Sequence, residues 1–183
     1  MRLEGKNGTG KTTLLRTICG LFAADSGEVL WQGESIKKQD EAYRKELLYL
    51  GHNNAIKADL TALENLRINN SLAGEAATSH DLMQALEKIG LYAFEDLPTR
   101  QLSQGQKRRV ALARLILSKA RLWILDEPFV ALDVAAVELL QNIIAKHVEN
   151  GGMVILTTHQ EVPLTSGEII RVSLDERNTA HAQ

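Results

Sequence analysis

The sequence lacks any long apolar segment. No stretch approaches the roughly 20 consecutive apolar residues that a helix needs to cross a bilayer. The first residues, Met1-Arg2-Leu3-Glu4-Gly5, contain no apolar segment that could act as a signal sequence. We therefore expect a soluble protein that stays in the cytoplasm.

An excess of positive charge and a second cysteine are also lacking. Lys and Arg total 21 against 23 Asp and Glu, for a formal net charge of -2. No basic field is available to hold a polyanion, so nucleic acid is not an expected partner. The single cysteine, Cys19, cannot form an internal disulfide, and its apolar neighbours predict a buried, inert thiol.

The pattern of apolar residues predicts one α/β domain with a largely parallel sheet. The chain of 183 residues fits a single domain. Short apolar runs alternate with segments of helical spacing, as in α/β proteins. The predicted strands cover residues 28–32, 122–125, 153–156 and 169–172. The predicted helices cover residues 10–18, most of 61–93, a segment after Ser103, and 135–147.

A helical subdomain is predicted between two of these strands, over about residues 61–118. It begins at a capping box, Thr61-Ala62-Leu63-Glu64. Leu82, Leu86 and Ile89 then form an apolar stripe that ends at Gly90. The polar residues 175–183 are expected to be frayed.

One segment near the start has the spacing of a P-loop: Gly5-Lys6-Asn7-Gly8-Thr9-Gly10-Lys11-Thr12. Glycines at these places let backbone N–H groups turn toward phosphate oxygens, and the following helix offers its positive N-terminus. Lys11 would reach the β- and γ-phosphates, and the Thr12 hydroxyl would ligate Mg²⁺. We assign ATP binding to residues 5–13, so that Thr13 is included. The alternative is an ordinary glycine turn before a helix.

Two carboxylates and a histidine follow predicted buried strands. Asp126 and Glu127 come directly after Leu122-Trp123-Ile124-Leu125, where a parallel sheet presents its ligand site. Asp126 would hold Mg²⁺, and Glu127 would accept a proton from the attacking water or orient it. His159 would hydrogen-bond the γ-phosphate. Without the P-loop, the acidic pair would equally suit a solvated strand cap and His159 a surface histidine.

A further segment, Leu102-Ser103-Gln104-Gly105-Gln106, is a capping box by local physics, and helix initiation alone could explain it. However, this segment lies between the P-loop and the acidic strand and resembles the LSxGQ signature of ABC-type ATPases. The resemblance implies a dimer, in which the signature of one copy closes over the ATP held by the P-loop of the other. Val130-Ala131-Leu132-Asp133 is similar to the family's D-loop, in which Asp133 would help to join the two sites.

The helix that begins at the signature carries four cationic residues. Lys107, Arg108, Arg109 and Arg114 are expected to form its solvated face.

The resemblance extends to one subfamily, the ATP-binding subunits of the bacterial cytochrome c maturation system, or heme exporter. It is carried by these segments: Gly27-Glu28-Val29-Leu30-Trp31-Gln32-Gly33, Tyr49-Leu50-Gly51-His52, Leu60-Thr61-Ala62-Leu63-Glu64-Asn65-Leu66, Trp123-Ile124-Leu125-Asp126-Glu127-Pro128-Phe129 and Leu156-Thr157-Thr158-His159-Gln160. It implies ATP hydrolysis with Mg²⁺, membrane-spanning partner subunits and a peripheral position on the cytoplasmic face of the bacterial inner membrane.

His52 occupies the place of a glutamine that, in the family at large, contacts magnesium and couples ATP binding to the membrane subunit. Imidazole is a poor magnesium ligand, so we expect a coupling or water-mediated role for His52, with a plain loop residue as the alternative. Asn53-Asn54-Ala55 departs from the family's usual pattern just after it.

The resemblance also implies an antiparallel β region before the P-loop, with an aromatic residue that stacks on adenine. Residues 1–4 supply at most a short strand there, so we expect an N-terminally truncated chain of marginal stability and activity, which an upstream start would restore. An aromatic–base stack is worth about 1–3 kcal/mol, so its loss would weaken ATP binding.

Three functions stay open at this point. The chain could serve a heme exporter or another transporter, act on chromosomes or ribosomes, or bind ATP with little hydrolysis. A long coiled coil or a second cassette would indicate the chromosomal or ribosomal proteins, and the sequence shows neither feature.

Overall fold

A computed structural model describes residues 1–159, 162–164 and 166–175 of the chain. Its centre is a sheet of five parallel strands: β1 (Arg2–Glu4), β4 (Leu47–Leu50), β5 (Leu122–Asp126), β6 (Met153–Thr157) and β7 (Arg171–Ser173). Their spatial order is β4-β5-β6-β1-β7, with every pair parallel. The predicted α/β class with a largely parallel sheet is therefore confirmed, and β1, which leads into the P-loop, lies inside the sheet.

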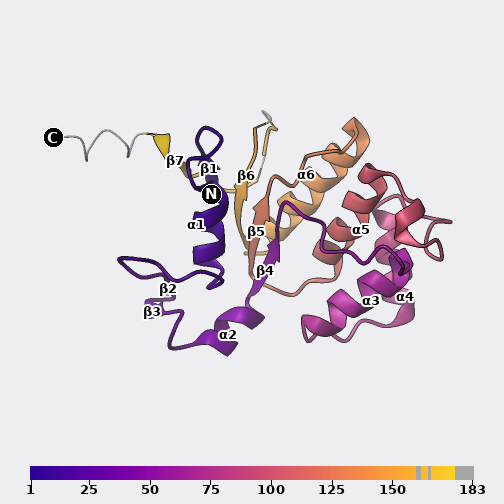
Figure 1. Ribbon diagram of the computed structural model, residues 1–183, viewed down its shortest axis with the longest axis horizontal. Coiled ribbons are helices and arrows are strands. Elements are labelled where there is room, and N and C mark those ends of the chain that lie inside the picture. Colours follow the sequence, from indigo (N-terminus) through magenta and orange to yellow (C-terminus); the bar gives the residue numbers. More distant parts are fainter. Residues whose placement is uncertain (160–161, 165, 176–183) are drawn as a thin grey trace.

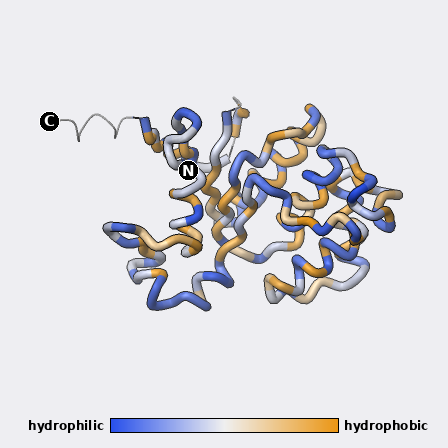
Figure 2. The backbone as a smooth tube through the Cα atoms, in the orientation of Figure 1, coloured by the Kyte–Doolittle hydropathy of each residue, from blue (hydrophilic) through white to orange (hydrophobic). Residues whose placement is uncertain are grey.

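Strand β5 is buried on both faces of the sheet. All five of its residues are buried. Leu122 and Ile124 pack into one apolar cluster with Leu15 of the first helix, whereas Trp123 and Leu125 pack into a second cluster on the other face. Figure 2 shows apolar residues along these central strands. The continuous apolar run thus predicts correctly a strand that is covered on both faces.

The helices form two groups around the sheet (Figure 1). They are α1 (Lys11–Ile18), α2 (Asp40–Lys45), α3 (Ala62–Leu72), α4 (Ser79–Lys88), α5 (Gln104–Leu117) and α6 (Val134–Glu149), with a 3₁₀ turn η1 at Thr99–Gln101. Helices α3, α4 and α5 come between β4 and β5 in the sequence and pack against one another. They are the helices of the predicted inserted subdomain.

Local capping explains where these helices start. Thr61, Thr78 and Ser103 each form a full capping box with the residue three positions later. The predicted box at Thr61 is confirmed. The predicted stripe Leu82, Leu86 and Ile89 is buried, because α4 turns this face toward α5 and the core.

Several predicted elements differ from the observed ones. The strand expected over 28–32 is only β2 (Leu30–Trp31), which pairs antiparallel with β3 (Glu34–Ser35) outside the central sheet. Its shortness follows from a tight turn, since Gln32 and Gly33 both have positive φ. The helical stretch 61–93 is two helices, and the last strand is shifted to 171–173. Helix α2 and strand β4 were not predicted.

Cys19 has the predicted environment. It is 7% exposed, and burial raises the pKa of its thiol to about 12. In the described part of the chain, no helix is both long and apolar enough to span a bilayer. Residues 176–183, most of the tail expected to be frayed, lie outside the described residues.

Candidate functional site

The P-loop lies between β1 and α1, where a parallel strand delivers the chain to a helix N-terminus. Gly10 is the N-cap of α1 with φ of 93°, a left-handed conformation that favours glycine. Because glycine has no side chain, Gly10 cannot cap the first backbone N–H groups of α1. These N–H groups remain available to bind an anion. Lys6, Asn7 and Gly8 are exposed at the loop tip.

The Lys11 side chain folds back over this loop. Its Nζ donates hydrogen bonds to the carbonyl oxygens of Gly5 and Lys6, at 2.6 Å and 3.0 Å. Thr9 closes the loop, since its hydroxyl donates to the Lys6 carbonyl at 2.9 Å. The Lys11 ammonium group thus lies beside the loop's backbone, where it can contact phosphate oxygens. Thr13, the last residue assigned to ATP binding, is exposed.

Thr12 and Asp126 are in contact at the carboxyl end of β5. The Thr12 hydroxyl donates to Asp126 Oδ2 at 2.8 Å, and the Thr157 hydroxyl donates to Asp126 Oδ1 at 2.7 Å. Asp126 is 3% exposed. Thr157, fully buried at the end of β6, also accepts a hydrogen bond from the Glu127 backbone N–H at 2.9 Å. The predicted pair Thr12 and Asp126 is brought together, and Thr157 is a supporting residue that sequence reasoning missed.

This pair of oxygen ligands fits Mg²⁺. A threonine hydroxyl and a carboxylate are hard oxygen donors, and Mg²⁺ is usually held by one or two protein ligands together with phosphate oxygens and water. Among the described residues, no group of three or more His, Cys, Asp or Glu side chains could hold a metal. Thr12 and Asp126 would therefore hold the ion jointly with a nucleotide.

Glu127 and His159 also face each other. His159 Nε2 lies 3.3 Å from Glu127 Oε1, and the His159 backbone N–H donates to Glu127 Oε2 at 3.3 Å. The Glu127 side chain is 14% exposed, whereas that of His159 is 51% exposed. A carboxylate largely shielded from solvent beside an accessible imidazole is suited to orienting a water molecule and accepting its proton.

The predicted signature segment begins α5. The Ser103 hydroxyl accepts from the Gln106 N–H, and Gln106 Oε1 accepts from the Ser103 N–H. Leu102 anchors the segment with 5% exposure, whereas Ser103 and Gln104 are exposed. Gly105 approaches another loop, because a Cβ there would lie 3.0 Å from the Ala131 carbonyl oxygen.

The signature and the P-loop lie apart in one chain. Helices α1 and α5 stand on opposite sides of the central sheet (Figure 1) and contribute to different apolar clusters. Within the described residues, no hydrogen bond or ion pair joins 5–13 to 102–106.

Comparison with known proteins identifies the family. Residues 1–130 match the ABC transporter family. The chain belongs to the ABC transporter family. It is 53% identical over 174 residues to the cytochrome c biogenesis ATP-binding export protein CcmA of Dechloromonas aromatica, covering 95% of this chain and 85% of that protein. It is 49% identical over 180 residues to the CcmA of Escherichia coli strain K12, covering 98% and 85%.

A solved family structure supports the same assignment. The ATP-binding cassette MJ0796, in a dimeric post-hydrolysis state bound to ADP and Pi, superimposes with a TM-score of 0.76. The two chains are 26% identical, and the match covers 87% of this chain and 74% of that one. The family and fold expected from the sequence are confirmed.

Asp133, the predicted D-loop residue, has two contacts within this ABC domain. Its Oδ1 caps α6 by accepting from the Ala136 N–H at 2.9 Å. Its Oδ2 pairs with Arg109 Nη2 at 2.6 Å, which joins the start of α6 to the signature helix. These contacts fix the loop 127–133 beside the signature.

The prediction of a solvated face on α5 was wrong for Arg108, and Arg114 is also partly buried. Arg108 is 3% exposed and donates hydrogen bonds to the backbone around the acidic pair. Burial lowers the pKa of its guanidinium, an effect that the charges of Asp126 and Glu127 oppose. The helical spacing of α5 gives one signal for this position, because Arg108 lies four residues before the buried Leu112 and therefore on the same face of the helix.

His52 lies just after β4 and is exposed. Its neighbours Gly51 and Asn54 contact Arg108, but the contacts of the described residues place no partner beside the His52 ring. Gln160, quoted for the family resemblance, lies outside the described residues.

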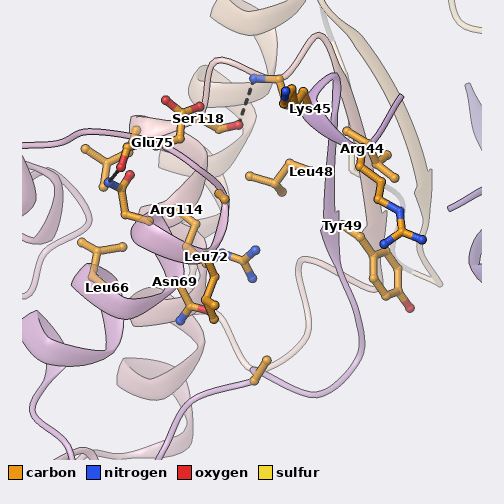
Figure 3. Close-up of a pocket in the computed structure, with 16 residues that line it drawn as sticks. Arg44, Lys45, Leu48, Tyr49, Leu66, Asn69, Leu72, Glu75, Arg114 and Ser118 are labelled. Atoms are coloured by element: carbon orange, nitrogen blue, oxygen red, sulfur yellow. Dashed lines mark hydrogen bonds between the residues drawn. The ribbon is translucent and has the colours of Figure 1, made fainter. Parts of the chain in front are cut away.

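A separate groove of about 400 Å³ opens between the sheet and the helical subdomain (Figure 3). Arg44, Lys45 and Tyr49 line one wall, and Leu72 and Arg114 line the other. Burial lowers the pKa of the Arg114 guanidinium. The P-loop, the acidic pair and the signature do not contribute to this groove.

Proposed function

We propose that this chain is the ATP-binding and ATP-hydrolysing subunit of an ABC transporter that acts in cytochrome c biogenesis, where it drives the export or handling of heme. The observation that carries the nucleotide site is the hydrogen bond between Thr12 and Asp126, which joins the P-loop to the acidic strand. The identity of 53% to a cytochrome c biogenesis export protein supports the biological process.

Each site residue has a role in this proposal. The backbone of residues 5–13 binds the phosphates, and Lys11 neutralises the β- and γ-phosphates. Thr12 and Asp126 hold Mg²⁺, which offsets the phosphate charge when bound. Glu127 orients the attacking water and accepts its proton, and His159 donates to the γ-phosphate. ATP is the substrate on which these groups act.

The working unit in this proposal is a pair of copies. Because the signature and the P-loop of one chain lie on opposite sides of the sheet, Ser103 and the N-terminus of α5 are free to meet a phosphate held by the other copy. The LSQGQ segment, residues 102–106, then completes the partner's site, and Asp133 helps to join the two sites. A dimeric cassette of the same fold supports this arrangement.

The proposed cellular setting follows from the relatives. One domain spans residues 1–183, with the helical subdomain over about 61–118, and it binds membrane-spanning transporter subunits at the cytoplasmic face of the bacterial inner membrane. Nucleic acid is not an expected partner, because a net charge of -2 leaves the chain without an excess of positive charge. His52, within the loop that Arg108 holds through Gly51 and Asn54, takes part in coupling to those subunits.

Replacing the proposed base tests the activity. Glu127→Gln keeps the size of the side chain but removes its basicity, so steady-state ATP turnover should fall by roughly 10²- to 10⁴-fold. Binding of MgATP, followed with a fluorescent analogue, should persist. Glu87→Gln on the exposed face of α4 is the matched control and should turn over like the parent. Parental turnover in Glu127→Gln would remove Glu127 from the mechanism.

A further inference from the structure

Arg108 ties together segments that are distant in the sequence. Its Nη2 donates to the carbonyl oxygens of Asp126 and Glu127 at 3.3 Å and 2.8 Å, and its Nε donates to that of Pro128 at 3.4 Å. A guanidinium group with 3% exposure therefore holds the backbone of three consecutive residues at the end of β5. Buried hydrogen bonds from a charged donor are among the strong ones.

The backbone held in this way is unusual at Glu127. Its φ is 50°, a left-handed conformation that a residue with a side chain rarely adopts without support. The support comes from two sides, since the Glu127 carbonyl accepts from Arg108 and its N–H donates to the Thr157 hydroxyl. The direction in which the carboxylate leaves the backbone, toward His159, depends on that conformation.

The opposite side of the guanidinium reaches the loop after β4. Arg108 Nη1 donates to the Gly51 carbonyl at 3.2 Å and to Asn54 Oδ1 at 3.1 Å. Residues 51–54 and the acidic segment thus share a single cation. A planar guanidinium suits both sides at once because its donors are spread over three nitrogens, whereas a lysine presents all its donors from one nitrogen.

We propose that Arg108 is a positioning residue for ATP hydrolysis. By holding the backbone of residues 126–128, it sets the orientation of the Glu127 carboxylate. Because Arg108 also binds Gly51 and Asn54, this orientation depends on the position of the loop after β4. A movement of that loop would change the rate of hydrolysis without changing how the P-loop binds nucleotide. The inference rests on the proposed function, since it assigns the activation of water to Glu127.

The test compares Arg108→Gln and Arg108→Lys with Arg114→Gln, an arginine six positions further along the same helix. Turnover of MgATP by Arg108→Gln should fall roughly 10- to 100-fold, as is typical when a supporting group around a reactive residue is lost, while KM stays close to the parental value. Arg108→Lys should recover part of the loss. Arg114→Gln should match the parent, because Arg114 lines the separate groove.

A combined variant separates positioning from a general structural effect. In the Glu127→Gln background, Arg108→Gln should cause no further fall in residual turnover, because residues that act as a unit are not additive. An equal further fall would overturn the proposal. So would parental turnover in folded Arg108→Gln, or a rise in KM by the same factor as kcat falls.

Three outcomes keep the test decisive. If Arg108→Gln does not fold, Arg108→Lys and Asn54→Ala carry it: each should lower kcat at constant KM, and an unchanged kcat in both would overturn the proposal. If Glu127→Gln itself turns over ATP normally, the proposed role of Glu127 fails. If only the Arg108 variants behave normally, the proposed function stands and this inference fails.

Discussion

Thr12 and Asp126 lie 114 positions apart and share a hydrogen bond of 2.8 Å. The bond links the first turn of α1 to the end of β5, so the phosphate-binding loop and the acidic strand have a fixed relation before any nucleotide arrives. Preorganisation of this kind reduces the entropy that binding must otherwise remove.

Removal of the Thr12 hydroxyl should therefore alter the magnesium requirement. Thr12→Ala loses a ligand oxygen, and the Mg²⁺ concentration for half-maximal ATP turnover should rise by roughly tenfold or more, as expected for a lost interaction of about 1.4 kcal/mol. Thr12→Ser retains the hydroxyl and serves as the matched control. An unchanged magnesium titration for Thr12→Ala would exclude Thr12 as a ligand.

Ser103 allows stability and function to be separated. Ser103→Ala loses the helix cap and should lower the free energy of unfolding by about 1 kcal/mol. Ser103→Asp keeps a good cap but places a negative charge where the partner's phosphate would lie, so its stability should be near that of the parent while ATP-driven pairing is lost. Chemical denaturation and light scattering would measure the two effects. Normal pairing by Ser103→Asp would show that this helix end meets no phosphate.

The central features of the fold could be predicted because they depend on local patterns. The continuous apolar run before Asp126 predicts a strand buried on both faces, and the capping box at Thr61 predicts a helix start. Strand β4 was missed because Leu47–Leu50 is short and follows the charged helix α2, whose one buried residue is Tyr43. Such a helix lacks the apolar periodicity on which prediction relies.

The site could be predicted only in part for a related reason. Residues 5–13, Asp126 and Glu127 follow from motif spacing and from their places at strand ends. Arg108 and Thr157 act through contacts between distant segments, and only the folded chain shows that Arg108 lies beneath the acidic pair. A cationic side chain on a helix is usually solvated, so the spacing from Leu112 alone does not establish that Arg108 is buried.

The pH dependence of stability should carry a contribution from His147. Its ring stacks on Trp123 with centroids 3.7 Å apart, and burial lowers its pKa from the usual 6.5. The unfolded chain therefore takes up a proton before the folded chain as pH falls through about 6.5, and stability should decline on acidification in that range. His147→Phe keeps a stacked ring without titrating, so its melting temperature should decline less between about pH 7.5 and pH 5.5. Equal declines would refute this assignment.

The most direct test of the account is the ATP-dependent association of two copies. Glu127→Gln, which should bind MgATP without hydrolysing it, is measured by analytical ultracentrifugation with and without saturating MgATP. The account predicts a monomer without nucleotide and a species of twice the mass with MgATP, and adding Ser103→Asp should abolish the larger species. A Glu127→Gln chain that binds MgATP and stays monomeric, even with its membrane partners present, would contradict the account.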